Sequence, residues 1–197
     1  MAYVIIGLGN PGKEYEETRH NAGMVAVEAF RTLESFEGFI ENKKYKGQIA
    51  DGTIGREKVL LVLPETFMNK SGLSAAAAVK SKKAAEKLVV VHDDLDLPIG
   101  AIKISFGKNS GGHRGVESVM RALKTKDFVR IRIGVSPATS GGKLKKPKGE
   151  KEVLKFLMGK FSPKDREDFR KVLKRVSQAL HVIVIESKER AMSEFNK

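Results

Sequence analysis

Short, mostly apolar segments alternate along the chain with segments whose apolar residues recur every three or four positions. The first pattern predicts β-strands and the second predicts amphipathic helices. Strands separated by helices favour one layered α/β domain over residues 1–197. The predicted strands are Tyr3–Leu8, Lys46–Ile54, Lys58–Leu63, Leu88–Val91, Ala101–Phe106 and Val129–Val135; the predicted helices are Asn21–Leu33, Gly72–Lys83, Val116–Leu123 and one that starts at Ser162.

Turn and cap signals refine these elements. Gly55-Arg56 between two strands predicts a hairpin. Ser71 is a plausible N-cap for the helix that follows it, and Ser162 followed by Pro163 is a strong helix start. Residues 136–149 are rich in Ser, Gly, Pro and Lys, which predicts a mobile basic loop before the C-terminal helix.

Composition narrows the class of protein. The 197 residues include no cysteine, which excludes disulfides and thiol chemistry and fits a reducing cytoplasm. No basic leader opens the sequence, and no apolar run approaches the roughly 20 residues that span a bilayer. We therefore expect a cytoplasmic protein without a membrane segment.

The charge is high and unevenly distributed. The formal net charge is +13, and residues 143–197 hold 16 Lys and Arg against 8 Asp and Glu. Such an excess favours a polyanionic partner such as nucleic acid, because binding releases the counterions of its phosphates. The alternative is a basic surface that only keeps the protein soluble.

The segment Gly7–Gly12 directly follows the first strand. Its Gly-x-Gly-x-x-Gly spacing formally matches a dinucleotide-binding loop. However, Pro11 and the charged residues after it suit a loop better than a helix start, and no strand with an acidic end follows about 20 residues later. The alternative is that the glycines shape a turn that presents Asn10, with His20 at the start of the next helix.

Two other strand ends carry polar side chains. His92–Pro98 places three aspartates after a buried strand, where one carboxylate could accept a hydrogen bond from an imidazole and raise its basicity. Asn69 follows another strand, and its amide could bind a peptide backbone or a carbonyl. Taken singly, the first segment would be better explained as a solvated acidic turn and the second as a helix-capping loop.

The remaining histidines are less informative. Asn109–Gly115 is a glycine-rich loop that contains His113 and enters a helix, so phosphate contact and plain loop structure stay equally open. The four histidines show no His-x-x-x-His or other paired-ligand spacing, so we expect no metal site. His181, near the end of what we take as the last helix, is expected to be structural.

Six blocks stand out together by their order and spacing: Gly7-Leu8-Gly9-Asn10-Pro11-Gly12, Thr18-Arg19-His20-Asn21-Ala22-Gly23, Thr66-Phe67-Met68-Asn69, His92-Asp93-Asp94-Leu95-Asp96-Leu97-Pro98, Gly111-Gly112-His113 and Arg132-Ile133-Gly134. With these blocks the chain resembles the bacterial peptidyl-tRNA hydrolases over nearly its whole length. The resemblance implies a single domain in which helices flank a twisted, mostly parallel mixed β-sheet. It also implies an enzyme that cleaves the ester bond between a peptide and the terminal ribose of tRNA, without metal or cofactor.

The resemblance also assigns residue roles. His20 would be the general base that activates water, and Asp93 the carboxylate that orients and polarises it. Asn10 would meet the peptide backbone and help separate N-blocked peptidyl-tRNA from free aminoacyl-tRNA. Asn69 would hold the substrate near the ester, with Tyr15 and Phe67 contacting the acceptor end.

The glycine block departs from the family pattern. Where the family usually has Gly-Gly-His-Asn-Gly, this chain has Arg114 after His113. Arginine cannot accept a hydrogen bond and carries a fixed charge, so the role of the asparagine does not transfer. We keep His113 and Arg114 as candidate substrate-binding residues, Arg114 through a backbone phosphate of the tRNA.

Charge placement together with the resemblance suggests where tRNA phosphates lie. Lys103, Arg132 and the Lys143–Lys148 loop are the expected contacts, with the C-terminal helix adding attraction. We expect a monomer that binds the acceptor stem and the attached peptide. The competing hypotheses are a non-catalytic RNA-binding protein on the same fold and a nucleotide-dependent α/β enzyme.

Overall fold

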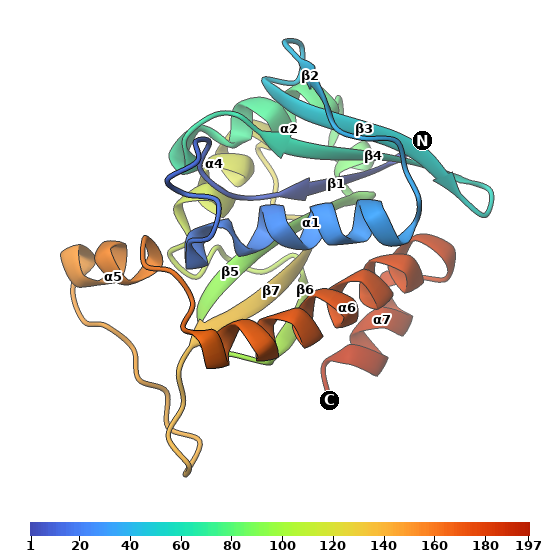
Figure 1. The fold of residues 1–197 in the computed structure, drawn as a ribbon. Helices are drawn as coiled ribbons and strands as arrows, with labels where there is room; N and C mark the ends of the chain where they lie inside the picture. Colours follow the sequence, from blue (N-terminus) through green and yellow to red (C-terminus); the bar gives the residue numbers. More distant parts are fainter.

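The computed structural model describes residues 1–197 and has one seven-stranded sheet, in the order β2-β3-β4-β1-β5-β7-β6 (Figure 1). The four central strands β4, β1, β5 and β7 run parallel, while β2, β3 and β6 are antiparallel to their neighbours. The expected α/β fold with a mixed sheet is confirmed. The strands are β1 (Tyr3–Gly7), β2 (Ile40–Asn42), β3 (Gly47–Ile54), β4 (Glu57–Pro64), β5 (Leu88–Pro98), β6 (Ile102–Phe106) and β7 (Val129–Ser136).

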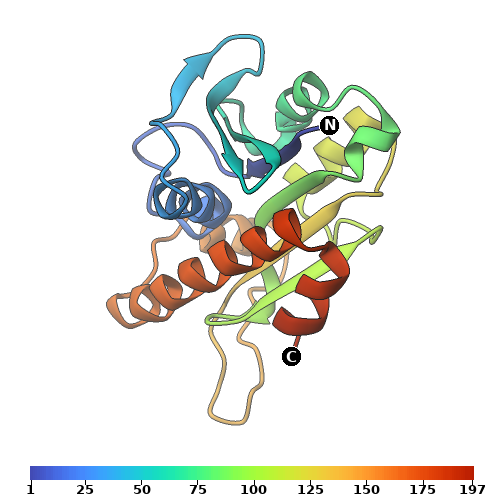
Figure 2. The same cartoon turned by 90° about the vertical axis from the view of Figure 1, so that its right-hand side faces the viewer.

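Helices cover both faces of this sheet (Figures 1 and 2). The face with the larger apolar cluster is covered by α1 (Ala22–Leu33), α6 (Pro163–Ile185) and α7 (Lys188–Phe195). The other face is covered by α2 (Gly72–Ala78), α3 (Lys82–Ala85) and α4 (Arg114–Leu123). The short helix α5 (Glu150–Leu157) lies beside the 3₁₀ turn η1 (Arg19–Asn21). No helix combines the length and the apolar character needed to cross a membrane.

The central strands are buried on both faces, which explains their continuous apolar runs. In β1, Ile5 packs into the cluster under α1 and α6, while Ile6 packs into the cluster under α2 and α4. Val89 and Val90 divide in the same way in β5. These strands therefore form a rigid centre whose ends can position side chains.

The helix predicted over Gly72–Lys83 is wrong in two respects. It ends at Ala78 because the buried, β-branched Val79 is extended, and α3 then starts with Ser81 accepting a hydrogen bond from Ala84 N–H. Ser71 does not cap α2, since its hydroxyl donates to the carbonyl of Met68. A local serine competing as a cap thus divides what the sequence pattern suggests is one helix.

Other expectations on the C-terminal half hold in part. Ser162 caps α6 by accepting a hydrogen bond from Asp165 N–H, and Pro163 opens the helix as predicted. His181 lies on α6 with its Nδ1 2.8 Å from Glu34, but α6 is not the last helix because α7 follows it. In residues 136–149, one isolated antiparallel bridge joins Ala138 and Leu144, and the mobility of this loop stays a prediction.

Candidate active site

The topology gathers the candidate residues at one edge of the sheet. The parallel strands β4, β1 and β5 are adjacent, so their carboxyl ends meet at that edge. Asn10 and His20 follow β1, Asn69 follows β4, and Asp93 lies within the extended end of β5. Segments far apart in the sequence are brought together in this way.

A close backbone approach seats His20 at the edge. Gly23, the second residue of α1, lies so near the sheet that a Cβ there would overlap the carbonyl oxygen of Val91 and the backbone of Leu8. Only glycine permits this approach. The turn η1, which carries His20, is therefore held directly over the end of β5.

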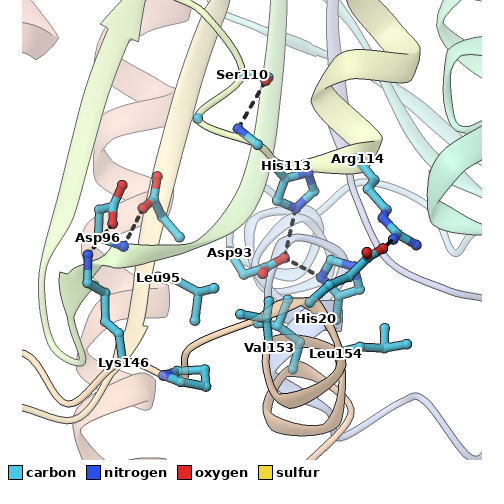
Figure 3. A pocket seen from close by; sticks show the side chains of 16 residues that line it. His20, Asp93, Leu95, Asp96, Ser110, His113, Arg114, Lys146, Val153 and Leu154 are labelled. Atoms are coloured by element: carbon cyan, nitrogen blue, oxygen red, sulfur yellow. Dashed lines mark hydrogen bonds and ion pairs between the residues drawn. The ribbon is translucent and has the colours of Figure 1, made fainter.

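One carboxylate oxygen connects two imidazoles (Figure 3). The Oδ1 atom of Asp93 lies 2.9 Å from His20 Nδ1 and 3.0 Å from His113 Nε2. The Asp93 side chain is only 2% exposed, and both histidines are largely buried as well. We call His20, Asp93 and His113 the imidazole–carboxylate triad.

The hydrogen bonds determine which nitrogens carry protons. The N–H of Val116 points at His113 Nδ1, 3.3 Å away, so this nitrogen accepts and caps α4. The Nε2 atom of His113 therefore carries a proton and donates a hydrogen bond to Asp93. His20 likewise donates from Nδ1 to the ionised carboxylate, which leaves the lone pair of His20 Nε2 free to accept a proton.

Charge and burial shift both partners. Burial acts to raise the pKa of Asp93, but the two neighbouring imidazoles lower that pKa by more than burial raises it. The carboxyl group therefore stays ionised. Burial acts to lower the pKa of His20, yet attraction to Asp93 and the hydrogen bond with it raise that pKa above its ordinary value of 6.5. The nearby Arg114 opposes this rise.

His20 and Asp93 line a cleft of about 280 Å³ that α5 covers from one side (Figure 3). Two ion pairs lie at the rim of the cleft: Arg114 with Glu150 of α5, and Lys146 of the preceding loop with Asp96 at 2.7 Å. The cleft therefore combines a buried base with a charged rim. Its walls also include Ser110, Gly111, Gly112, His113, Pro147, Val153, Leu154 and Leu157.

A second group of candidates lies where β1 and β4 end. The backbone N–H and carbonyl of Asn10 are both bonded to the Asn21 side chain, at 2.9 Å each. The Asn10 Oδ1 atom accepts from Met68 N–H at 2.8 Å, which leaves its NH₂ group as the free donor. Phe67 and Asn69 flank Met68 with exposed side chains, and Tyr15 is half-buried. No hydrogen bond joins Asn10 or Asn69 to the triad.

Lys103 and Arg132 line a separate basic cleft with Lys108 and Arg130. Arg132 Nε donates to Asp94 at 2.6 Å, which ties this cleft to the end of β5. Arg130 is buried and donates to the carbonyl oxygen of Asn109 at 2.7 Å, so it supports the glycine loop instead of facing solvent.

Local spacing predicted no metal site, but a fold can gather groups that are distant in sequence. The polar atoms of the triad lie within 4.8 Å of one another, a geometry that could also suit a cation. Here Asp93 Oδ1 already accepts two hydrogen bonds from the imidazoles. A cation between them would have to replace those bonds, and the same bonds also suit the transfer of a proton.

Three contributors were not identified from the sequence. Asn21 stands in one of the six blocks, but its bonds to Asn10 needed the fold. Arg130 was visible only as a polar residue in an alternating strand. Glu150 carries no sequence signal at all, because it approaches Arg114 from 36 residues away.

Comparisons with known proteins agree with this geometry. The family model described as peptidyl-tRNA hydrolase matches residues 4–197. The peptidyl-tRNA hydrolase of Syntrophotalea carbinolica is 37% identical over 98% of this chain and 96% of its own length, and that of Aquifex aeolicus is 36% identical over 98% and 96%. The crystal structure of peptidyl-tRNA hydrolase from Acinetobacter baumannii matches with a TM-score of 0.87 and 30% identity, over 99% of this chain and 94% of that one.

Proposed function

The chain belongs to the peptidyl-tRNA hydrolase family, and from this premise we propose how its triad cleaves the substrate. The protein is a hydrolase of peptidyl-tRNA, which confirms the family resemblance and the enzyme class. The bond to be cleaved is the ester between the peptide and the terminal ribose of tRNA, and His20 is the general base. The observation that carries this proposal is the pair of imidazoles on Asp93 Oδ1.

The reaction follows from the proton positions. The free Nε2 atom of His20 takes a proton from water as the water oxygen attacks the ester carbonyl carbon. The bond from that carbon to the ribose oxygen then breaks, and the proton on His20 goes to the ribose oxygen. Asp93 stays ionised and stabilises the transient imidazolium. An ester is activated enough that a well-positioned water suffices as the nucleophile.

The asparagines are proposed to hold the peptide. The free NH₂ group of Asn10 is a donor for the peptide backbone, a contact that would favour N-blocked peptides over free aminoacyl groups. Asn69, exposed beside it, would hold the substrate near the ester. Phe67, with 56% of its surface exposed, and Tyr15 would contact the acceptor end.

Phosphate contacts are proposed on the basic surfaces. The cleft of Lys103 and Arg132 is joined to β5 by the hydrogen bond from Arg132 to Asp94, the residue after Asp93. This cleft is therefore close enough to the triad to bind the acceptor stem of the same tRNA. The Lys143–Lys148 loop, which borders the catalytic cleft at Lys146, would add contacts. We propose that one copy of the chain acts alone, in the cytoplasm.

Release of the N-acetyl-aminoacyl group from tRNA, measured with a chelator present, tests this proposal. We expect His20→Ala to abolish turnover nearly completely, because it removes the lone pair that takes the proton from water in this mechanism. His181→Ala is the matched control, since His181 lies on α6 at the surface and should leave turnover intact. Free aminoacyl-tRNA should be a poor substrate.

Turnover by His20→Ala at the wild-type rate would contradict the proposal. It would favour a role in RNA binding without this chemistry, an alternative that the comparisons do not support.

A further inference from the structure

Arg114 is a cation at the rim of the catalytic cleft. It is the first residue of α4 and directly follows the triad member His113. A cation in the first turn of a helix gains nothing from the helix, whose amino end already carries partial positive charge. Its presence therefore does not serve the stability of α4, and a role toward an anion in the cleft is the natural alternative.

In this structure Arg114 already pairs with an acidic side chain of the protein itself. The guanidinium pairs with the carboxylate of Glu150, the first residue of α5. Both side chains line the same cleft as His20, and Figure 3 shows Arg114 beside His20 there. Arg114 is 55% exposed and Glu150 is 79% exposed. Ion pairs between such exposed side chains contribute little free energy, so a competing anion can break this one easily.

We propose that Glu150 is an intramolecular placeholder, and that a phosphate of the bound tRNA displaces it from Arg114 during substrate binding. This inference rests on the proposed function and adds a phosphate contact inside the catalytic cleft. Carboxylate and phosphate both match the planar guanidinium fork, so one can replace the other without rearranging Arg114. The expected occupant is a phosphodiester close to the esterified ribose, because Arg114 and His20 line the same cleft.

Displacement of Glu150 from Arg114 would also change the pKa of His20. The titratable and charged groups that share the cleft with His20 are Asp93, Asp94 and Asp96 from β5, His113 and Arg114 at the start of α4, Lys146 from the basic loop, and Glu150 from α5. The charge of Arg114 lowers the pKa of His20, and Glu150 partly neutralises that charge in the free enzyme. A variant that frees Arg114 should therefore shift the acid limb of the pH profile as well as change substrate binding.

Steady-state kinetics on N-acetyl-aminoacyl-tRNA test the exchange. Glu150→Gln frees Arg114, so we expect KM to fall about two- to fivefold, the range that a weak exposed ion pair allows. The acid limb of kcat/KM should move to lower pH, because the unneutralised guanidinium disfavours the charged form of His20. Arg114→Gln should raise KM and move the same limb to higher pH.

Glu152→Gln is the matched control. It removes the same charge from the first turn of α5, but Glu152 makes no ion pair, so its effect on KM should be under half that of Glu150→Gln. In the Arg114→Gln background, Glu150→Gln should no longer change KM, since the two residues act through one contact.

Equal changes in KM for Glu150→Gln and Glu152→Gln would contradict the proposed role of Glu150. A change in KM from Glu150→Gln that persists in the Arg114→Gln background would contradict it as well. Such a result leaves the hydrolase mechanism intact as long as His20→Ala is inactive. Activity of His20→Ala would instead remove the mechanism itself, whatever Glu150 does.

Discussion

Asp93 Oδ1 accepts hydrogen bonds from two imidazoles, those of His20 and His113, and the two histidines have different roles. In the proposed mechanism His20 gains and loses a proton at Nε2 in each turnover, whereas His113 is held in one tautomer by the N–H group that it caps at Nδ1. His113 therefore donates to Asp93 throughout the cycle and keeps the carboxylate oriented. Attraction to the two imidazoles and the hydrogen bonds from them keep a carboxylate that is 2% exposed ionised.

The pH profile tests this arrangement at the level of one residue. The proposed mechanism needs neutral His20, so kcat/KM should fall as the pH drops through a pKa that lies above 6.5. Asp93→Asn removes the charge that raises this pKa, while burial, which lowers it, remains. The acid limb should then move to lower pH, and kcat should fall by about tenfold or more because the imidazolium loses its partner.

The fold should survive this substitution, since asparagine has nearly the same shape. Circular dichroism and the thermal unfolding midpoint are the controls. An acid limb that stays in place in Asp93→Asn would show that the carboxylate does not set the basicity of His20.

The residue pattern alone placed an imidazole and three aspartates near strand ends and left open which carboxylate pairs with it. The family resemblance named His20 and Asp93. The sequence did not indicate that His113 also donates a hydrogen bond to Asp93. The Gly111-Gly112-His113 block indicated a loop that faces a ligand, and nothing local shows that its imidazole returns to a carboxylate 20 residues away.

At the level of elements, one helix start determines the geometry of the triad. Gly23 lets α1 approach β1 and β5 closely, and η1 immediately before it carries His20. Gly23→Ala should push α1 outward, with a loss of about 1–3 kcal/mol in the free energy of unfolding from overpacking. The kcat value should fall as well, because His20 moves away from Asp93.

Gly38→Ala is the matched control. A Cβ atom added at Gly38 would meet no other atom within 4 Å, so this substitution should leave both quantities near wild type. Denaturant unfolding and turnover of the same two variants give the comparison. A Gly23→Ala protein with wild-type stability and turnover would show that α1 does not need this close approach.

The elements also show where sequence patterns are sufficient. Strands such as β1 and β5 were predictable because burial on both faces demands apolar runs. The split between α2 and α3 was not, because it depends on a buried Val79 that prefers the core to the helix. Helix α5 lies in a lysine-rich stretch and gains its place from contacts with distant residues, so local pattern did not reveal it.

At the level of the whole molecule, basic residues surround the triad from two sides. The cleft of Lys103 and Arg132 lies on one side of β5, and the Lys143–Lys148 loop borders the catalytic cleft. Net charge alone could not distinguish such a surface from a generally basic exterior. The topology makes the distinction, because it places both groups next to the strand end that carries Asp93.

Charge reversal in the loop tests whether these surfaces bind one polyanion. Lys143 and Lys145 are exposed and make no ion pair, so Lys143→Glu/Lys145→Glu should raise KM for N-acetyl-aminoacyl-tRNA and flatten its dependence on salt. The kcat value should stay near wild type because neither residue touches the triad.

The control is Lys82→Glu/Lys83→Glu, which makes the same change in net charge on α3. This helix precedes the start of β5 and so lies at the opposite edge of the sheet. An equal rise in KM for both double variants would mean that the tRNA responds to total charge, and the loop would then be a solvated flap beside the cleft.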